Sequence, residues 1–423
     1  MTVPRTMDAV VLSGTGFENL CVRQVPVPEP GPDQVLARVD AAGVCSSLLM
    51  IVTQGADFVS LNGWDVNRYP IILGEEGTVT IARVGGNLEE QYEAGQRFAV
   101  QPAVDVVPIN HRGRYKDHAR GVNKVGVGLT LPGLLAQYIL ITEETLAGRC
   151  LVRLPDEDMP YFAAALAEPI ACVYAAQQHH LHFHKQGPLA PRIPKAGLRA
   201  GGITVVIGAG AMGRMHVEMA LPYRPRLIIL SDLVQHRLDN AHAQLCEKAA
   251  CGGVVLTTVM ADQLQATVSE VSEGKGADDV ILAVGSLDAL QHGLGLLAKG
   301  GVADFFSALP PDEHKVTLDS KLVHYDEVTL VGSTGGQPSD LVAALDAMTS
   351  GQIDPGSYVF SVGDLEHCPR VLKMIQQKQI DGKTILYPHT QLSHLQFVNR
   401  WDTPREQAHL EEHLRLYHSY PGR

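Results

Sequence analysis

The chain has 423 residues, which is too many for one hydrophobic core, so its length predicts two domains. Hydrophobic residues make up 45% and charged residues 19%, an ordinary globular balance that excludes extended disorder. The formal net charge of −12 argues against nucleic acid or an anionic membrane as the main partner, but it is compatible with an anionic small substrate in a locally basic pocket.

The first part of the chain contains short strand-like segments separated by turns. Two apolar runs within residues 8–40 are interrupted by a Pro/Gly cluster at 26–32, which is typical of β domains. Further strand patterns cover residues 70–85, 96–104 and 136–141. Residues 105–133 are polar, contain glycines and have no periodicity, so we expect a long loop there. The pattern predicts a mostly β domain with irregular insertions.

A helical pattern begins after Pro160 and covers residues 163–181. Histidines occupy positions 179, 180, 182 and 184 at its end. We expect them to face solvent or to cap helix carbonyls, with metal binding as the less favoured alternative. The segment from His184 to Gly202 is rich in His, Pro and Gly and is the candidate hinge.

From residue 203 to about 350, strand and helix patterns alternate. Repeated βα units of this length predict a doubly wound parallel sheet that is covered by helices on both faces. From about residue 357 the chain is expected to return to the first domain. The predicted domains are therefore residues 1–185, completed by 357–423, and residues 186–356. The tail contains a further helical pattern at 406–418, whose function the sequence does not reveal.

A glycine-rich motif, Gly208-Ala-Gly210-Ala-Met-Gly213, directly follows the strand pattern at 203–207 and opens a helix. The first glycine permits a tight turn, the second lets the backbone approach a pyrophosphate, and the third allows close packing of helix and strand. Asp232 ends the next strand, where its carboxylate can accept hydrogen bonds from the adenosine ribose. The motif predicts a dinucleotide site.

The same carboxylate would repel a 2′-phosphate, so NAD(H) is favoured over NADP(H). Arg237 and His236 follow closely and keep NADP(H) open. Met212 lies within the motif and is assigned to the same site. The alternative is a glycine turn in a Rossmann-like domain that binds no dinucleotide.

Four motifs together suggest a family: GVCSS at 43–47, GEEG at 74–77, AEP at 167–169 and GAGAMG at 208–213. Their order resembles the zinc-dependent branch of the medium-chain dehydrogenase/reductase superfamily. The likeness is closest to sorbitol-dehydrogenase-like enzymes and sugar-phosphate reductases of the L-sorbose 1-phosphate reductase type. The resemblance implies a GroES-like β catalytic domain, a Rossmann NAD-binding domain, and a homodimer or homotetramer that pairs through the sheet edge near residues 327–336.

The resemblance also implies roles for single residues. Cys45 matches the first zinc ligand, Ser47 the hydroxyl that relays the substrate proton, and Glu168 a carboxylate ligand of polyol-type members. Glu75 replaces the histidine ligand that the family usually carries, and Glu76 keeps the glutamate that follows it. The implied metal ligands are Cys45, Glu75 and Glu168, with zinc as the expected ion.

Three anionic ligands leave such a site with a net charge near −1, which makes zinc a weaker Lewis acid. In the alternative without metal, Cys45 is a small buried hydrophobe, and Glu75 or Ser47 is a proton donor. That chemistry would suit reduction of a cyclic enone C=C bond.

The sequence thus predicts an NAD(P)-dependent alcohol or polyol dehydrogenase or reductase that acts on a polyol, a cyclitol or a sugar. A non-catalytic redox sensor and a lyase or epimerase with tightly held NAD are the alternatives. The basic loop at 110–120 could bind a phosphate through Arg112, Arg114, Lys116 and Arg120, or could be a solvated surface loop. No membrane-spanning run and no secretory signal pattern are seen, so we expect a cytoplasmic protein with reduced cysteines.

Overall fold

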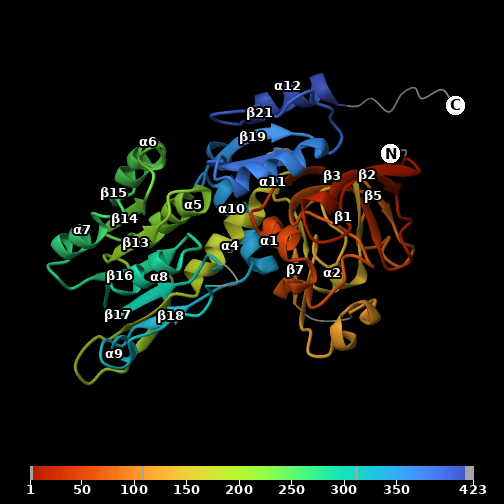
Figure 1. Ribbon diagram of the computed structural model, residues 1–423. Coiled ribbons are helices and arrows are strands. Elements are labelled where there is room, and N and C mark those ends of the chain that lie inside the picture. Colours follow the sequence, from red (N-terminus) through yellow and green to blue (C-terminus); the bar gives the residue numbers. More distant parts are fainter. Residues whose placement is uncertain (1–2, 106–108, 310–312, 415–423) are drawn as a thin grey trace. The chain divides into compact units, whose positions relative to one another are not determined.

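The computed structural model describes residues 3–105, 109–309 and 313–414 (Figure 1). Contacts divide the chain into two compact units: unit 1 is Met1–Pro169 with Gln337–Arg423, and unit 2 is Ile170–Gly336. These divisions fall earlier than the expected ones after residues 185 and 356. As a result, the helix at 338–349, which the pattern assigned to the Rossmann domain, belongs to unit 1.

Unit 1 is built on antiparallel sheets, as its short apolar runs predict. The largest sheet has the order β10-β6-β5-β3-β20-β19-β21, with β9 also paired to β3, and β2-β1-β4 form a second sheet. Strands β19 and β20 are parallel, and the other pairs in these sheets are antiparallel. The strands are β1 Thr6–Leu12, β2 Leu20–Pro26, β3 Val35–Gly43, β4 Ile71–Ile72, β5 Glu76–Val84, β6 Arg97–Val100, β7 Ala103–Asp105, β8 Lys124–Gly126, β9 Tyr138–Ile141, β10 Leu151–Arg153, β19 Val359–Gly363, β20 Lys383–Leu386 and β21 Gln396–Phe397.

The returning chain completes the large sheet of unit 1 because β20 pairs with β3. Ile385 and Leu386 of β20 lie opposite Gly43 and Ala42, so the last part of the chain shares a sheet with the first. The helices of unit 1 are α1 Ser47–Gln54, α2 Glu143–Ala147, α3 Tyr161–Ala165, the start of α4 Ala167–Gln178, α10 Pro338–Thr349, α11 Cys368–Gln376 and α12 Thr403–His413. Part of the helical pattern expected at 406–418 lies outside the described residues.

The segment expected to be a long loop, residues 105–133, is more ordered than its composition suggests. Strands β7 and β8 pair as a short antiparallel ladder, and two 3-10 turns, Arg112–Arg114 and Lys116–Ala119, lie between them. Residues 106–108 are outside the described residues. The expected long loop therefore contains a short strand and two 3-10 turns, and the end of β7 overlaps its first residue.

Unit 2 contains the predicted parallel sheet. Its order is β15-β14-β13-β16-β17-β18, that is third, second, first, fourth, fifth and sixth, and every pair is parallel. The strands are β13 Ile203–Ile207, β14 Leu227–Asp232, β15 Val255–Met260, β16 Ala277–Leu282, β17 Leu297–Asp304 and β18 Thr329–Val331. The strand order reverses between β13 and β16, and in such sheets ligands bind at the carboxyl ends of the strands beside this point.

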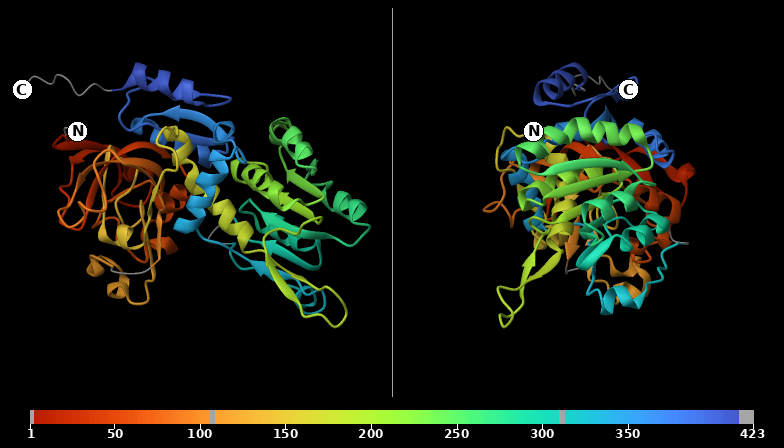
Figure 2. Two further views of the ribbon diagram at one scale, coloured as in Figure 1. Left: turned by 180° about the vertical axis from the view of Figure 1, so that it is seen from behind. Right: turned by 90° about the vertical axis from the view of Figure 1, so that its left-hand side faces the viewer.

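Helices cover both faces of this sheet (Figure 2). One buried cluster joins the sheet to α5 and α6, and another joins it to α7 and α8. The helices of unit 2 are α5 Ala211–Ala220, α6 Gln235–Cys251, α7 Leu264–Val271, α8 Leu287–Leu294 and α9 Ser320–His324, besides the rest of α4. The sequence pattern did not reveal β15 and α7, which complete the doubly wound fold. None of the described helices is both long and apolar enough to cross a membrane.

The candidate hinge is instead part of an antiparallel hairpin, made of β11 Leu181–His184 and β12 Ile193–Ala196. Its tip extends away from the sheet of unit 2 (Figures 1 and 2). The expectation for the neighbouring histidines was wrong in two cases, because His180 and His182 are buried. His179 does bond a backbone carbonyl, that of Gly332, and His184 is exposed, as expected.

Candidate active site

The glycine motif forms the turn between β13 and α5, at the point where the strand order reverses. Gly208 has a φ of 109°, a left-handed conformation that glycine adopts without strain. A Cβ on Gly213 would lie 1.7 Å from the carbonyl oxygen of Gly208, so only glycine lets helix and strand approach this closely. A Cβ on Gly210 would meet nothing within 4 Å. The surface at the second glycine is therefore open, as a site for a pyrophosphate requires.

Asp232 is the last residue of β14, and its carboxylate is fixed by backbone groups. Oδ2 accepts a hydrogen bond from the Ala209 N–H at 2.7 Å, and Oδ1 accepts one from the Val234 N–H at 2.9 Å. This carboxylate is thereby tied to the glycine turn itself. Met212 lies in the first turn of α5 and Arg237 in the first turn of α6, and both are half-buried.

A second constellation lies entirely in unit 1. Cys45 follows β3, Ser47 opens α1, and the Glu75–Glu76 pair stands at the start of β5. The Ser47 hydroxyl donates a hydrogen bond to the Glu75 carboxylate, and Glu75 lies close enough to Cys45 to raise the pKa of its thiol. The four predicted catalytic residues are therefore neighbours, because β3 and β5 are paired and α1 begins next to their ends.

Glu76 is fully buried and forms an ion pair with Lys383, whose Nζ lies 2.5 Å from Oε1. Its other oxygen, Oε2, has no hydrogen-bond partner. A Cβ on Gly43, which lies opposite Glu76 in the sheet, would come within 2.1 Å of that oxygen. Gly43 thus leaves the space that the buried carboxylate occupies.

The charges around Cys45 favour the binding of a cation. Burial raises the pKa of the Cys45 thiol well above its usual value, and the charges of Glu75, Glu76 and Glu168 raise it further, whereas Lys383 lowers it. Burial also raises the pKa of Glu75, against the effect of its hydrogen bond from Ser47. Burial lowers the pKa of Lys383, but Glu76, Cys45 and Glu168 together raise it above its usual value, so this amine stays charged.

These donors fit a divalent cation in ligand type and in charge. A thiol and carboxylates are ligands that zinc accepts, and several acidic groups here face one buried ammonium group. In the described part of the chain, the ligand atoms of Cys45, Glu75 and Glu168 are not all within 4.8 Å of one another. Glu75 and Glu168 are both close enough to Cys45 to raise the pKa of its thiol, and Glu168 is buried at the start of α4.

The basic residues proposed for substrate binding lie on the 3-10 turns of unit 1. The Arg114 guanidinium stacks over the rings of Trp64 and Tyr69, at 5.5 and 5.0 Å from their centroids. Arg112 donates from Nε to the His118 carbonyl at 3.2 Å, and the side chain of Lys116 is exposed. The guanidinium groups of Arg112 and Arg114 are therefore held by other residues of unit 1. In a freely solvated loop such contacts would not be expected.

Sequence reasoning missed Lys383 and Gly43. Lys383 lies 307 residues from Glu76 in the chain and reaches it only because β20 joins the sheet beside β3. The signal that was present is a lysine that opens a short strand, KTIL, all of whose residues are buried.

Comparison with known proteins agrees with this description. The family model "Alcohol dehydrogenase GroES-like domain" matches residues 31–156. A mannitol-1-phosphate 5-dehydrogenase of Aliivibrio fischeri is 27% identical, over 89% of this chain and 86% of its own. An L-sorbose 1-phosphate reductase of Klebsiella pneumoniae is 25% identical, over 81% and 80%. The solved structure of 2R,3R-butanediol dehydrogenase from Bacillus subtilis superposes with a TM-score of 0.70 at 19% identity, over 90% of this chain and 99% of that one.

The chain therefore carries an alcohol dehydrogenase GroES-like domain, and its fold, a β unit interrupted by a Rossmann-type unit with a GxGxxG turn, resembles that of medium-chain alcohol and polyol dehydrogenases. Its motifs resemble those of the zinc-type alcohol and polyol dehydrogenases among them.

Proposed function

We propose that this chain transfers hydride between a nicotinamide cofactor and a polyol, cyclitol or sugar, as alcohol or ketone, with a phosphorylated form as the preferred substrate. The observation that carries the proposal is the hydrogen bond from Ser47 to Glu75 beside Cys45, because it links a path for the substrate proton to candidate metal ligands. The relatives that act on mannitol 1-phosphate and sorbose 1-phosphate support this substrate class.

The residues of unit 1 account for the proton that accompanies each hydride. When an alcohol is oxidised, hydride leaves with the cofactor and the hydroxyl proton must go elsewhere. The Ser47 hydroxyl donates to Glu75 and can still accept a hydrogen bond. It can therefore receive the substrate proton while its own proton passes to the Glu75 carboxylate, and reduction reverses both transfers.

We further propose zinc as the ion at Cys45, Glu75 and Glu168, where it would supply a Lewis acid for the substrate oxygen. The support is the group of acidic side chains around the half-buried Cys45 thiol, and the Glu76 Oε2 atom, which has no hydrogen-bond partner. Metal analysis of the purified protein should give zinc, and a Cys45→Ala variant should lose the zinc held at this site. Because the ligand atoms of Cys45, Glu75 and Glu168 are not all within 4.8 Å of one another, the metal-free alternative, reduction of a cyclic enone, stays open. No metal at Cys45 together with enone turnover would favour that alternative.

For the cofactor we propose NAD(H). Asp232 is held at the glycine turn by two backbone bonds, so its charge is fixed where an adenosine 2′-phosphate would approach. An Asp232→Ser variant should lose discrimination against NADPH, measured as the ratio of kcat/KM for the two cofactors.

For the substrate phosphate we propose Arg112, Arg114 and Lys116 as the binding group. Arg112→Ala and Lys116→Ala should raise KM for phosphorylated substrates and leave KM for the unphosphorylated forms unchanged.

The test of the whole proposal is the absorbance of NADH at 340 nm with a panel of polyols, cyclitols, ketoses and their phosphates. Turnover of at least one member, abolished or strongly reduced by Ser47→Ala, is expected. Tight NADH binding without turnover of any member would instead favour a redox sensor.

A further inference from the structure

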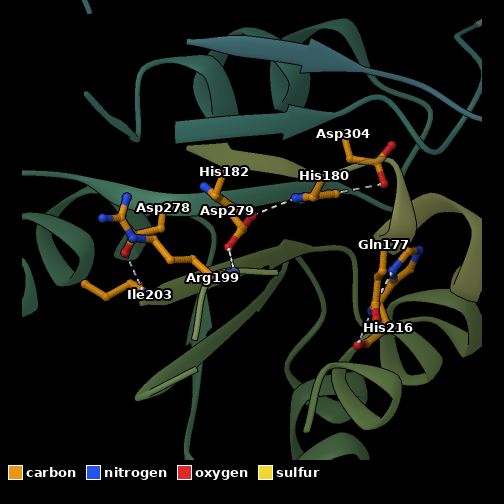
Figure 3. A network of polar contacts seen from close by, with 9 residues as sticks. All are labelled: Gln177, His180, His182, Arg199, Ile203, His216, Asp278, Asp279 and Asp304. Atoms are coloured by element: carbon orange, nitrogen blue, oxygen red, sulfur yellow. Dashed lines mark hydrogen bonds and ion pairs between the residues drawn. The ribbon is translucent and has the colours of Figure 1, made fainter. Parts of the chain in front are cut away.

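A buried cluster in unit 2 has no part in the function proposed above. His180 and His182 both donate to one oxygen of Asp279, from Nδ1 at 2.6 Å and from Nε2 at 2.8 Å (Figure 3). His180 and Asp279 are 0% exposed and His182 is 3% exposed. Asp279 belongs to β16 in the middle of the sheet, whereas the histidines come from the start of the β11–β12 hairpin. Ligand atoms of the three residues lie within 4.8 Å of one another.

Asp279 and His180 each have one further polar contact. The second oxygen of Asp279 accepts the Arg199 N–H at 2.9 Å, and the second ring nitrogen of His180 lies 3.6 Å from Oδ2 of Asp304 (Figure 3). Asp304 is the last residue of β17 and is fully buried. Metal-binding histidines characteristically direct their other N–H to a carboxylate or a carbonyl in this way, which fixes the ring and its tautomer.

The charges in this cluster do not balance easily without a further cation. In the described part of the chain, the ion-pair partners of Asp279 and Asp304 are histidines, with no lysine or arginine among them. Asp279 and Asp304 are both 0% exposed, so two carboxylate charges are buried here. A divalent ion with two neutral imidazoles and two carboxylates brings the net charge to zero.

The hairpin also needs an anchor that apolar packing does not provide. Within β11 only His182 is buried, and every residue of β12 is exposed. The apolar side chains of Phe183, Leu189 and Ile193 are 58%, 100% and 49% exposed. The side chains that hold this hairpin to the sheet are therefore those of the cluster.

We propose that His180, His182 and Asp279 form a structural site for a divalent transition-metal ion of the zinc type, with Asp304 as the carboxylate that orients His180. Two imidazoles and one carboxylate are ligands that zinc accepts. Atoms bonded at ~2.1 Å to a tetrahedral ion lie roughly 3.4 Å apart, so the side chains need to separate by less than about 1 Å. The ion would tie the hairpin to β16, and the site is separate from the one at Cys45.

The experiment uses the full chain with the Cys45→Ala change, which removes the other candidate site. Zinc per chain is measured by elemental analysis, before and after equilibration with Zn²⁺ and removal of the excess. We expect about one zinc per chain in this background, a loss of that zinc with His182→Gln, and no loss with His184→Gln, which changes an exposed histidine of the same strand. Asp304→Asn should retain the site but bind zinc 10–100-fold more weakly.

A second measurement covers the case in which His182→Gln does not fold. Chelator treatment of the Cys45→Ala protein should lower its Tm and speed hydrogen exchange in residues 181–196, and added Zn²⁺ should reverse both effects. No zinc in the Cys45→Ala background, or zinc that is retained by the His182→Gln variant, would overturn the proposal. Either result leaves the proposed dehydrogenase function untouched, because that function does not depend on this cluster.

Discussion

Gly210 and Gly213 lie three positions apart in one turn, yet their surroundings differ completely. Gly213 packs against the carbonyl of Gly208, whereas Gly210 faces open space. The close packing at Gly213 matters for stability. The open surface at Gly210 matters for binding, because only an open position can receive a ligand. The two roles can therefore be separated by the same alanine substitution.

We expect Gly213→Ala to destabilise the protein by about 1–3 kcal/mol, since the added Cβ overlaps backbone that cannot move away. Gly210→Ala should change the free energy of unfolding by less than about 0.5 kcal/mol. It should nevertheless weaken NADH binding by roughly tenfold, equivalent to about 1.4 kcal/mol, because its methyl group occupies the approach of the pyrophosphate. Thermal unfolding followed by circular dichroism and an NADH titration measure the two effects. Equal effects of both variants on NADH binding alone would contradict this assignment.

The ion pair of Glu76 and Lys383 gives a second prediction at the scale of residues. Lys383→Met leaves a buried carboxylate without its partner and should cost about 3–5 kcal/mol. The double variant Glu76→Gln/Lys383→Met removes both charges and should recover most of that loss. Urea unfolding can be followed by tryptophan fluorescence, since Trp64 and Trp401 both belong to unit 1. Additive losses in the double variant would show that the two charges do not stabilise each other.

At the scale of elements, α12 is attached to unit 1 by buried polar contacts. Glu406 accepts the backbone N–H groups of Tyr161 and Phe162 at 2.8 Å, and the Tyr387 hydroxyl donates to it at 2.7 Å. His409, one turn further along the helix, stacks against Tyr387 at 5.0 Å between ring centroids. The docking of α12 should therefore depend on pH.

Burial and, to a smaller extent, the neighbouring His413 lower the pKa of His409 to about 4, against the opposing effect of Asp364. In the released helix the pKa returns to roughly 6.5. The released form thus binds more protons between these values, and docking weakens as the pH falls from about 6.5 to 4. Burial raises the pKa of Glu406, which favours docking as the pH falls, so the two groups oppose each other.

The contribution of His409 is isolated by comparing wild type with His409→Phe. Hydrogen exchange of residues 403–413, corrected for the intrinsic pH effect, should show that wild type loses more protection than the variant between pH 7.5 and 5. Identical losses in both proteins would remove His409 from the explanation.

Elements with strong periodicity could be predicted from the sequence, and those with weak periodicity could not. Strands β13, β14 and β16 are apolar runs because they are buried in a parallel sheet, so their existence was evident. Strand β15 lies at the edge of that sheet and is only partly buried, which obscures its pattern. Strand β12 is entirely exposed and carries no apolar signal.

At the scale of the whole molecule, the exposed edge of strand β18 leads us to expect self-association. It ends the parallel sheet, and nearby Leu318, Val323 and Tyr325 are 40%, 49% and 67% exposed. We propose that two chains pair along this edge. Light scattering should give twice the chain mass of 45.6 kDa. Val323→Glu should shift the protein toward the monomer, whereas Val59→Glu, which alters an 81% exposed apolar residue of unit 1, should not. A monomeric wild type would refute the pairing.

The sequence allowed the candidate active site to be predicted better than the buried histidine cluster, for a physical reason. Cys45, Ser47 and Glu75 stand in short motifs whose order along the chain is informative. His182 and Asp279 are 97 residues apart and meet only through the topology of unit 2. A histidine followed by an exposed phenylalanine carries no local sign that it is buried.

The central claim is that unit 2 binds the cofactor while the Cys45 site of unit 1 carries out the chemistry. Its most direct test measures, for Cys45→Ala and Ser47→Ala, both NADH affinity by fluorescence and the rate of NADH-linked turnover on the best substrate of the panel. We predict that both variants bind NADH as wild type does and lose at least about 100-fold in kcat, the scale of general acid–base catalysis. Undiminished kcat in both variants would contradict the assignment of the active site.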